Sequence, residues 1–491
     1  MKKSLQRVLT VVAVLSSVTS YLMAGDVTSQ TFFMPRSYAE NSEKELALHN
    51  YCLYHDMRED RDYVQPEDRS IIKMQNTYFY EGSTNEQDLA RYFLLGNKTS
   101  LQVAELGVSL TATTDRDINP RWFGVQSSSS QYKSTIAIRP DREAYGAIIN
   151  THHDMSKWVK GLWLGVLLPI VHVRHALDIT ETRTATFDTI HDAETSMINA
   201  LNNSDWLFGK FKPTSMSHTG LDDAQIKLGW NFWRKNEAKH WGLYLDALIP
   251  TGVRPSSEYV FEPTVGNVHW GLGAGTNLDW ELTTWKKAKV SVQLDAKYRY
   301  LFSDTERRSF DLTNGPWTRY LTLRKLNEVG TALVAGVVPG INYFTQDVKI
   351  TPRSRVDLFT ALHYKKSSLN VEAGYNLWWK DSEKISLDKT FDQSVGINFG
   401  GTASTYSDAT VGQVVPTADS SVTAVDPDTK FNLDSATHKS ALTHKIFAGV
   451  GLTGKVFDAK GMIGLGGSYE FADRNTALEQ WSVYGKTSLS F

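Results

Sequence analysis

The chain lacks the features that define several large classes of protein. Only one of its 491 residues is a cysteine, Cys52, so it can form no internal disulfide and no cysteine-based metal site. Basic and acidic residues nearly cancel, 52 against 54, which argues against a nucleic-acid-binding protein with a basic face. A mean hydropathy of −0.33 excludes a polytopic helical membrane protein, because such a protein needs repeated apolar runs of about 20 residues.

The N-terminus predicts export from the cytoplasm. Basic residues precede an apolar stretch at residues 8–18, and small residues follow up to Ala24. This order is typical of a secretory signal peptide over residues 1–24, with cleavage after Ala24 or after Ser20. The apolar stretch is too short to cross a membrane as a helix, and an uncleaved anchor is the alternative interpretation.

Most of the remaining chain alternates between apolar and polar residues. From Val290 to Tyr300, every second residue is apolar, and Ser, Gln, Asp, Lys and Arg fill the positions between. A period of two predicts strands with one apolar and one polar face. The same pattern recurs in residues 224–233, 241–249, 268–282, 356–379, 446–456 and 461–471.

Many of these predicted strands have ten or more residues, against about five or six in soluble sheets. A tilted strand of about ten residues crosses a bilayer. We therefore predict an all-β protein, a transmembrane antiparallel up-and-down β-barrel over residues 71–491, with apolar faces toward lipid and polar faces toward the lumen. Tryptophans near strand ends fit its interfacial belts, although a soluble core is the alternative: Trp230 with Trp233, Trp280 with Trp285, Trp378 with Trp379, and Trp481.

The last predicted strand resembles the terminal strand of Gram-negative outer-membrane β-barrels. Apolar positions alternate from Trp481 to Leu489, and the chain ends on Phe491. The resemblance implies a location in the bacterial outer membrane, with its lipid and lipopolysaccharide as partners. It also implies that Trp481, Leu489 and Phe491 are recognised by the barrel-assembly machinery.

Loop lengths predict the number of strands, because periplasmic turns are short and outside loops are long. Residues 179–221 and 381–442 are predicted outside loops, and residues 97–99 are a predicted inner turn. Residues 140–142 and residues 339–340 are either turns or kinks. Counting each as a kink gives 16 strands, and merging or dropping weak early strands gives 14. A short helix is expected within residues 186–207, in one extracellular loop, from apolar residues at helical spacing.

Residues 25–70 do not follow the barrel pattern. They are charged and only weakly periodic, and they include Glu43, Glu45 and Cys52. Two interpretations remain open for this segment: it is a periplasmic arm, or it is a plug that folds into the lumen.

A second resemblance concerns residues 220–275. Gly220, Asp222 and Asp223 precede a strand, a Pro-Thr-Gly turn follows at residues 250–252, and a glycine-rich strand comes next. This order is similar to outer-membrane proteins described as meta-pathway phenol-degradation-like, which are relatives of the long-chain fatty-acid transporter barrels. The resemblance implies a narrow barrel for hydrophobic or aromatic solutes.

Catalysis is not predicted. Barrel enzymes carry Ser, His and carboxylate groups at the outer rim, but residues 152–154 fall at the periplasmic end. His172 and His175 lie three residues apart, so on a strand they face opposite sides and share no simple metal site. The cluster from Ser215 to Asp223 has a composition typical of loops. No glycine-rich phosphate loop opens a helix, and no cofactor or metal is implied.

We predict an outer-membrane channel or transporter that gives small solutes passive passage. The alternative is a structural or adhesion barrel that acts through its long extracellular loops. Oligomeric state is not predicted. Candidate pore-lining residues are the charged members of the polar faces: Lys227, Asp279, Glu281, Asp295, Lys297, Arg299, Asp357, Glu372 and Lys486.

Overall fold

The computed structural model describes most of the chain. The described residues are 26–48, 72–105, 116–125, 132–183, 196–236, 239–285, 288–326, 332–387, 395–398, 410–412, 422–425, 430–456 and 459–490. The predicted signal peptide over residues 1–24 lies outside the described residues, as do residues 49–71 and the terminal Phe491.

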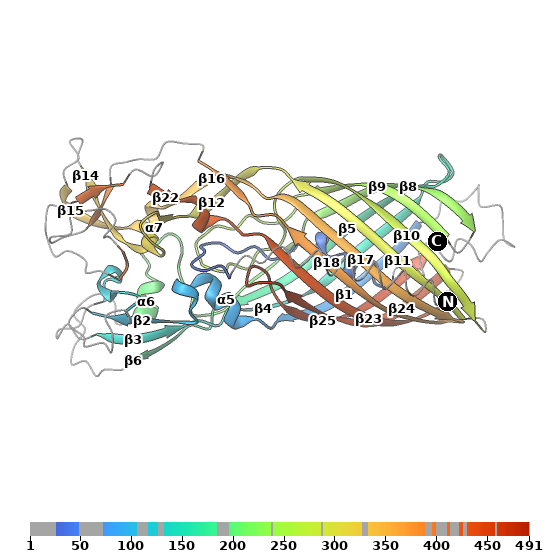
Figure 1. Ribbon diagram of the computed structural model, residues 1–491, viewed down its shortest axis with the longest axis horizontal. Coiled ribbons are helices and arrows are strands. Elements are labelled where there is room, and N and C mark those ends of the chain that lie inside the picture. The colour runs from blue at the N-terminus through green and yellow to red at the C-terminus, as the bar shows by residue number, and fades with distance from the viewer. Residues whose placement is uncertain are drawn as a thin grey trace.

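Long antiparallel strands close into a barrel (Figure 1). Each strand pairs with its neighbours along the chain, and β1 pairs with β25, which joins the two ends of the sheet. Closure pairs the backbone groups of every wall strand, as lipid requires. The wall strands are β1 (Ile72–Ser83), β4 (Asp141–Asp154), β5 (Leu162–Ala176), β8 (Ala224–Asn236), β9 (Lys239–Ile249), β10 (Gly271–Trp285), β11 (Ala288–Leu301), β17 (Arg353–Lys366), β18 (Leu369–Lys380), β23 (Ala441–Val456), β24 (Ala459–Ala472) and β25 (Gln480–Ser490).

The described barrel has twelve strands, so the prediction of 14 or 16 was wrong. Residues 97–99, predicted as an inner turn, instead follow helix α5 (Glu86–Phe93) in the long connection between β1 and β4. Residues 140–142 contain the start of wall strand β4, after a strand at residues 133–137 that pairs outside the barrel. Residues 339–340 are the point where another such strand ends and a short helix begins. Small sheets beside the barrel also alternate apolar and polar residues, so a period of two could not separate them from wall strands.

The outer face of the wall is apolar. Leu245, Leu465 and Ile463 expose 66%, 67% and 62% of their surface, although each lies between two buried or half-buried neighbours on its strand. The inward neighbours carry polar and charged groups, as Lys227, Asp246 and other buried residues show. Exposed apolar area on this scale is unfavourable in water and favourable in a hydrocarbon core.

Exposed aromatic side chains lie near both ends of the wall. Trp158, Trp230, Phe232, Trp241 and Tyr364 lie close to the short turns, and a second group lies near the long loops: Tyr80, Tyr145, Trp270, Tyr300, Phe302, Tyr469, Phe471 and Trp481. Two such belts are typical of the interfaces of a membrane barrel. The pair Trp378 with Trp379 does not belong to a belt as a unit, because Trp378 points into the lumen and is 3% exposed.

The connections alternate in length, as predicted. Residues 237–238, 286–287 and 367–368 join wall strands at one end, whereas residues 177–223 and 381–440 are long connections at the other. Bacterial barrels keep short turns in the periplasm. The short-turn end is therefore the periplasmic end, and the long connections lie outside.

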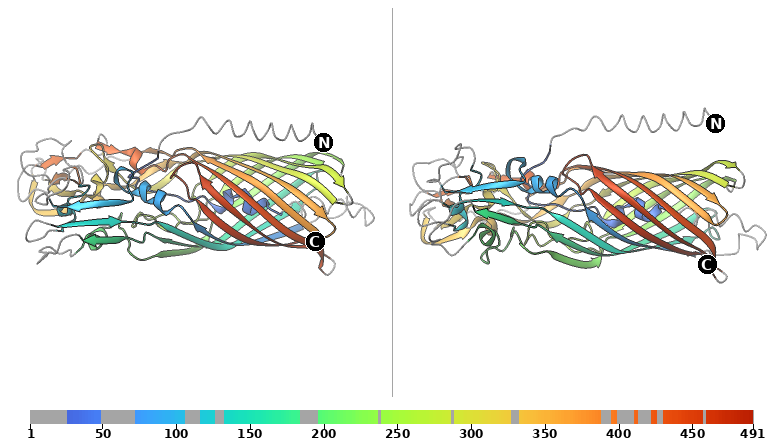
Figure 2. Two further views of the ribbon diagram at one scale, coloured as in Figure 1. Left: turned by 60° about the horizontal axis from the view of Figure 1, so that its bottom comes forward. Right: turned by 90° about the horizontal axis from the view of Figure 1, so that it is seen from below.

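The long connections fold into an outer layer beyond the barrel (Figures 1 and 2). Its strands are β2 (Ser100–Ala104), β3 (Lys133–Ala137), β6 (Thr180–Arg183), β12 (Asp304–Ser309), β13 (Asp311–Leu312), β14 (Thr322–Leu326), β15 (Ala332–Pro339), β16 (Thr345–Thr351), β19 (Lys384–Ser386), β20 (Val395–Asn398), β21 (Val422–Ala424) and β22 (Phe431–Asn432). One further strand, β7 (Met216–Leu221), pairs with residues 170–175 of β5 in the barrel sheet. Its helices are α5, η3 (Leu95–Asn97), η5 (Pro120–Phe123), α6 (Met197–Leu201), η6 (Thr318–Tyr320), α7 (Gly340–Tyr343) and η8 (Leu433–Ala436).

The outer layer has a hydrophobic core of its own. Tyr92, Trp122, Trp206, Trp317 and Tyr320 are all at most 6% exposed and belong to one apolar cluster. Such a core holds the long connections as folded structure rather than as separate loops. No helix among the described residues is long and apolar enough to cross a membrane.

The predicted loop helix is present but short. Helix α6 begins after Ser196, whose side chain accepts a hydrogen bond from the backbone N–H of Asn199, and it ends at Asn202 as predicted. The first part of the predicted range, residues 184–195, lies outside the described residues.

Glycines let wall strands and aromatic side chains approach closely. A Cβ at Gly229 would lie 2.1 Å from the ring of Trp163, and one at Gly466 would lie 2.4 Å from the ring of Tyr484. At Gly273 the backbone of the adjacent strand leaves no space for a side chain, because a Cβ would lie 2.2 Å from the carbonyl oxygen of Tyr298. The glycine-rich strands therefore serve packing in the wall.

We predict that Gly273→Ala destabilises the barrel. The added methyl would force β10 away from β11, at a cost of about 1–3 kcal/mol, typical of overpacking. Thermal conversion of the folded band on a semi-native gel measures the effect. Gly454→Ala is the matched control, because a Cβ there meets nothing within 4 Å. Equal conversion temperatures for the two variants would contradict the packing role.

Candidate functional site

Residues 26–48, here called the N-terminal segment, run through the interior of the barrel (Figure 2). The segment starts in the outer layer, where the side chain of Asn475 exchanges hydrogen bonds of 2.9 and 2.6 Å with the backbone of Val27. It contains η2 (Tyr38–Glu40) and α2 (Ser42–Leu46). It reaches Leu48, which packs against Gly449 and Gly464 on the inner wall.

In the outer half of the lumen, wall charges bind the segment through ion pairs. Arg355 donates to the carboxylate of Glu40 at 2.7 Å, and Arg299 approaches the same carboxylate at 3.4 Å. Arg36 of the segment pairs with Asp357 at 2.8 Å and with Glu470 at 3.2 Å. These contacts come from three different wall strands, β11, β17 and β24, so they hold the segment from several sides.

A second set of contacts holds α2 deeper in the lumen. Lys227 forms an ion pair with Glu45, and Lys445 lies 3.6 Å from Glu43. Lys486 donates to the carbonyl oxygens of Lys44 and Ala47 at 2.8 and 2.5 Å. The short helix thus places its two carboxylates and the carbonyl oxygens at its end on wall cations.

The segment also carries apolar contacts. Leu46 and Ala47 belong to one buried cluster with Phe359, Phe447 and Tyr484 of the wall. The rings of Phe359 and Phe447 stack with centroids 5.1 Å apart. Polar and apolar contacts together fill the lumen, because Glu43 and Lys44 are fully buried at 0% exposure.

Lysines of the wall offset the buried negative charge of Glu45 in α2. Burial by itself raises the pKa of Glu45, but the ammonium groups of Lys227 and Lys297 outweigh it and lower the pKa below its ordinary value. Glu45 therefore stays ionised at neutral pH, and the ion pair with Lys227 persists. A buried charge with a lost partner is costly, so these pairs fix where the segment lies.

The residues that carry the similarity over residues 220–275 lie together in the outer half of the lumen. Asp222 accepts hydrogen bonds from the side chain of Ser37 and the backbone N–H of Tyr38, at 2.7 and 2.6 Å. Asp223 accepts from the backbone N–H of Asn267 at 2.6 Å. Gly252 packs against the backbone of residues 265–266. The motif thus joins the wall to the N-terminal segment.

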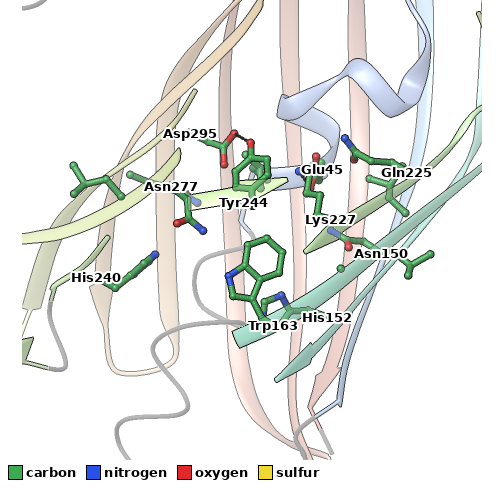
Figure 3. Close-up of a pocket in the computed structure, with 16 residues that line it drawn as sticks. Glu45, Asn150, His152, Trp163, Gln225, Lys227, His240, Tyr244, Asn277 and Asp295 are labelled. Carbon is green, nitrogen blue, oxygen red and sulfur yellow. Dashed lines mark hydrogen bonds and ion pairs between the residues drawn. The ribbon is translucent and has the colours of Figure 1, made fainter. Parts of the chain in front are cut away.

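A cavity lies beside α2, between it and strands β4, β5 and β8–β11 (Figure 3). Its aromatic lining includes Trp163, which stacks with His152 at 5.0 Å, and Tyr244, whose ring lies 5.9 Å from that of Trp163. Asn150, Gln225, Asn277 and Gln293 add amide groups to the lining. Lys227 reaches over the ring of Tyr244 at 5.1 Å and meets Glu45 at the edge of the cavity.

Eight of the nine candidate pore-lining residues are buried side chains of wall strands, at most 5% exposed: Lys227, Asp279, Asp295, Lys297, Arg299, Asp357, Glu372 and Lys486. Of these, Lys227, Arg299, Asp357, Glu372 and Lys486 contact the N-terminal segment. The ninth, Glu281, lies at a register shift near the short-turn end and accepts a bond from Thr284 at 2.5 Å. Whether these residues line a conducting path stays a prediction.

Sequence reasoning missed several residues of the site. Asp246, which pairs with Arg299 at 2.6 Å, and Lys445 occupy inward positions of alternating segments, so the period could have identified them. Arg355 precedes a clear alternation and was harder to place. The contacts of Glu40, Glu43 and Glu45 had no sequence pattern to reveal them.

The candidate catalytic residues do not converge. Ser217 is exposed, whereas Asp222 and Asp223 are buried. His172 bonds to Thr219 on the outer face, and His175 is buried against the ring of Phe261. In the described part of the chain, no three His, Cys, Asp or Glu side chains are arranged to hold a metal ion.

The closed wall, the apolar outer face and the two aromatic belts decide the location of the chain. The protein is a bacterial outer-membrane β-barrel. Trp481 and Leu489, two of the residues predicted for barrel assembly, lie on its outer face.

No protein-family model and no curated protein matches the chain. Several solved outer-membrane barrels are similar in structure. An outer-membrane channel of Pseudomonas putida F1 is 9% identical, with a TM-score of 0.38, over 87% of this chain and 100% of its own. A Pseudomonas aeruginosa FadL homologue is 10% identical, with a TM-score of 0.30, over 94% and 99%. The Pseudomonas putida toluene transporter TodX is 7% identical, with a TM-score of 0.27, over 94% and 95%. Scores this low support no inference about function.

We predict that Arg299→Met destabilises the folded barrel by about 3–5 kcal/mol, because Asp246 would lose its buried partner and Glu40 one of two. The matched control is Arg307→Met, which removes an exposed pair with Asp347 worth about 0–1 kcal/mol. Thermal conversion on a semi-native gel compares the two variants. An equal loss of stability in both variants would show that the ion pairs in the lumen stabilise the barrel no more than an exposed pair does.

Proposed function

We propose that the protein is a gated outer-membrane channel that gives small solutes passive passage, and that the N-terminal segment is its plug. The observation that carries the proposal is the way the segment is held. It enters the lumen on hydrogen bonds and ion pairs to several wall strands, and it contains no cysteine that could fasten it by a disulfide. Contacts of this kind can break and re-form together.

The filled lumen supports gating rather than permanent opening. The side chains of α2 are buried against the wall, so a solute cannot pass while α2 stays in place. Displacement of the segment would leave an interior lined by charges of both signs and by aromatic rings. Such a wall favours small solutes that combine a ring with polar groups, without strong selection among ions.

The second candidate function is adhesion through the outer layer. The observation that favours it is the separate hydrophobic core of that layer, which includes Trp206 and Trp317. A layer folded around its own core presents a defined surface to other molecules. Protein that binds matrix or host surfaces, yet is silent in conductance and solute uptake, would favour this function.

A disulfide between the segment and the wall tests the gate. If Gly449 had a Cβ, the Cγ of Leu48 would lie 3.2 Å from it, and a cysteine sulfur at position 48 would occupy nearly the same place. We predict that Leu48→Cys with Gly449→Cys, in a Cys52→Ala background, gives a protein that is silent in planar bilayers and in solute uptake when oxidised. Reduction should restore both.

Each single-cysteine variant is the control, because it changes the packing without locking the segment. A deletion of residues 26–48 should conduct continuously. Full conductance of the oxidised double variant would contradict a plug, and silence of the deletion variant in both assays would contradict a channel.

A further inference from the structure

The cavity beside α2 has one feature that packing does not require. Its cation, Lys227, belongs to the wall, but the carboxylate that neutralises it, Glu45, belongs to the N-terminal segment. If the segment moves, Lys227 loses Glu45 while it still faces the aromatic and amide lining (Figure 3). The other carboxylate of the lining, Asp295, belongs to the wall and already accepts a hydrogen bond from Tyr244 at 2.7 Å. Without its direct partner Glu45, the buried ammonium group of Lys227 can bind a further anion.

The same relation holds along the whole segment. Glu40 lies on Arg299 and Arg355, Glu43 is near Lys445, and Glu45 is on Lys227. Glu40, Glu43 and Glu45 therefore each lie close to a cation of the wall. The segment acts as an internal anion spread over sites that a passing carboxylate could use one after another.

With α2 in place the cavity holds only about 30 Å³, so room for the body of such a molecule arises when Glu45 and Leu46 withdraw from its lining. The rings of Trp163 and Tyr244 offer planar apolar surface, and their centroids lie 5.9 Å apart. Asn150 and Asn277 place amide groups in the same lining. Aromatic faces recognise a ring, amides recognise its polar substituents, and an ammonium group recognises a carboxylate.

We propose that this cavity is the docking site for a small organic carboxylate with a planar ring, whose carboxylate takes the place of Glu45 on Lys227. The inference rests on the proposed function, since it names the solute that displaces the plug. Binding of the solute and release of Glu45 are then one exchange of anions on Lys227, which couples recognition to opening.

Benzoate and benzamide are matched probes, because they share a ring and size but differ in charge. Calorimetry on folded, detergent-solubilised full chain measures their binding. Glu45→Gln should bind benzoate at least about tenfold more tightly than the unchanged protein, since the competing carboxylate is gone and one charge contact is worth about that factor. Benzamide binding should stay the same. Lys227→Gln added to Glu45→Gln should abolish the gain.

Glu258→Gln is the control, since it removes a carboxylate that pairs with Lys210 at 3.3 Å in the outer layer. It should leave benzoate binding unchanged. Equal benzoate affinity with and without Glu45→Gln, or an equal gain for benzamide, would overturn the proposal. Both results concern binding alone, so they stand apart from failure of the channel, which only conductance and uptake reveal.

A measurement on the unchanged protein covers the case in which the variants do not fold. Hydrogen exchange of the backbone amides of residues 42–48 should quicken in excess benzoate and not in excess benzamide, because benzoate removes Glu45 from Lys227 and loosens α2. No change with benzoate would overturn the proposal, and the same change with benzamide would also overturn it.

Discussion

The need to bury charge inside a narrow wall governs this structure. Lipid favours apolar side chains on the outer face, so the alternating strands send most lysines, arginines and carboxylates of the wall inward. Exposed charges of the wall, such as Glu143 with Arg174, lie near the long connections. Twelve strands enclose a lumen that the inward side chains nearly fill. Charges so placed need counter-charges at short range, and the N-terminal segment supplies part of them with Arg36, Glu40 and Glu45.

The wall and the segment therefore depend on each other. Asp222 accepts a hydrogen bond from the backbone N–H of Tyr38, and Lys486 donates to carbonyl oxygens at the end of α2. The glycines at 449 and 464 leave space for Leu48. A plug held mainly by apolar contacts would lose much buried surface if it left. A plug held by ion pairs can exchange its partners for an arriving ion, which is the property that a gate requires.

The sequence predicted the barrel class, the alternation of short and long connections and the inward side of the charged residues. The period of two carried all three, because it reports which side of a strand each residue occupies. It could not report the number of wall strands, since β3 (residues 133–137) and β4 (residues 141–154) alternate alike although only β4 enters the wall. Nor could it place Glu40 or Glu45, whose partners lie hundreds of residues away in the chain.

The central claim is that the two faces of each wall strand meet different media. Spin labels at Leu362, which is 52% exposed on the outer face, and at Ser291, a buried inward residue on the adjacent strand at nearly the same depth, test it most directly in a Cys52→Ala protein in lipid vesicles. We predict frequent collisions of the label at Leu362 with oxygen and few with a polar nickel complex, and few oxygen collisions at Ser291. A label at Leu362 that meets neither reagent would place that residue in a dry protein core and contradict the account.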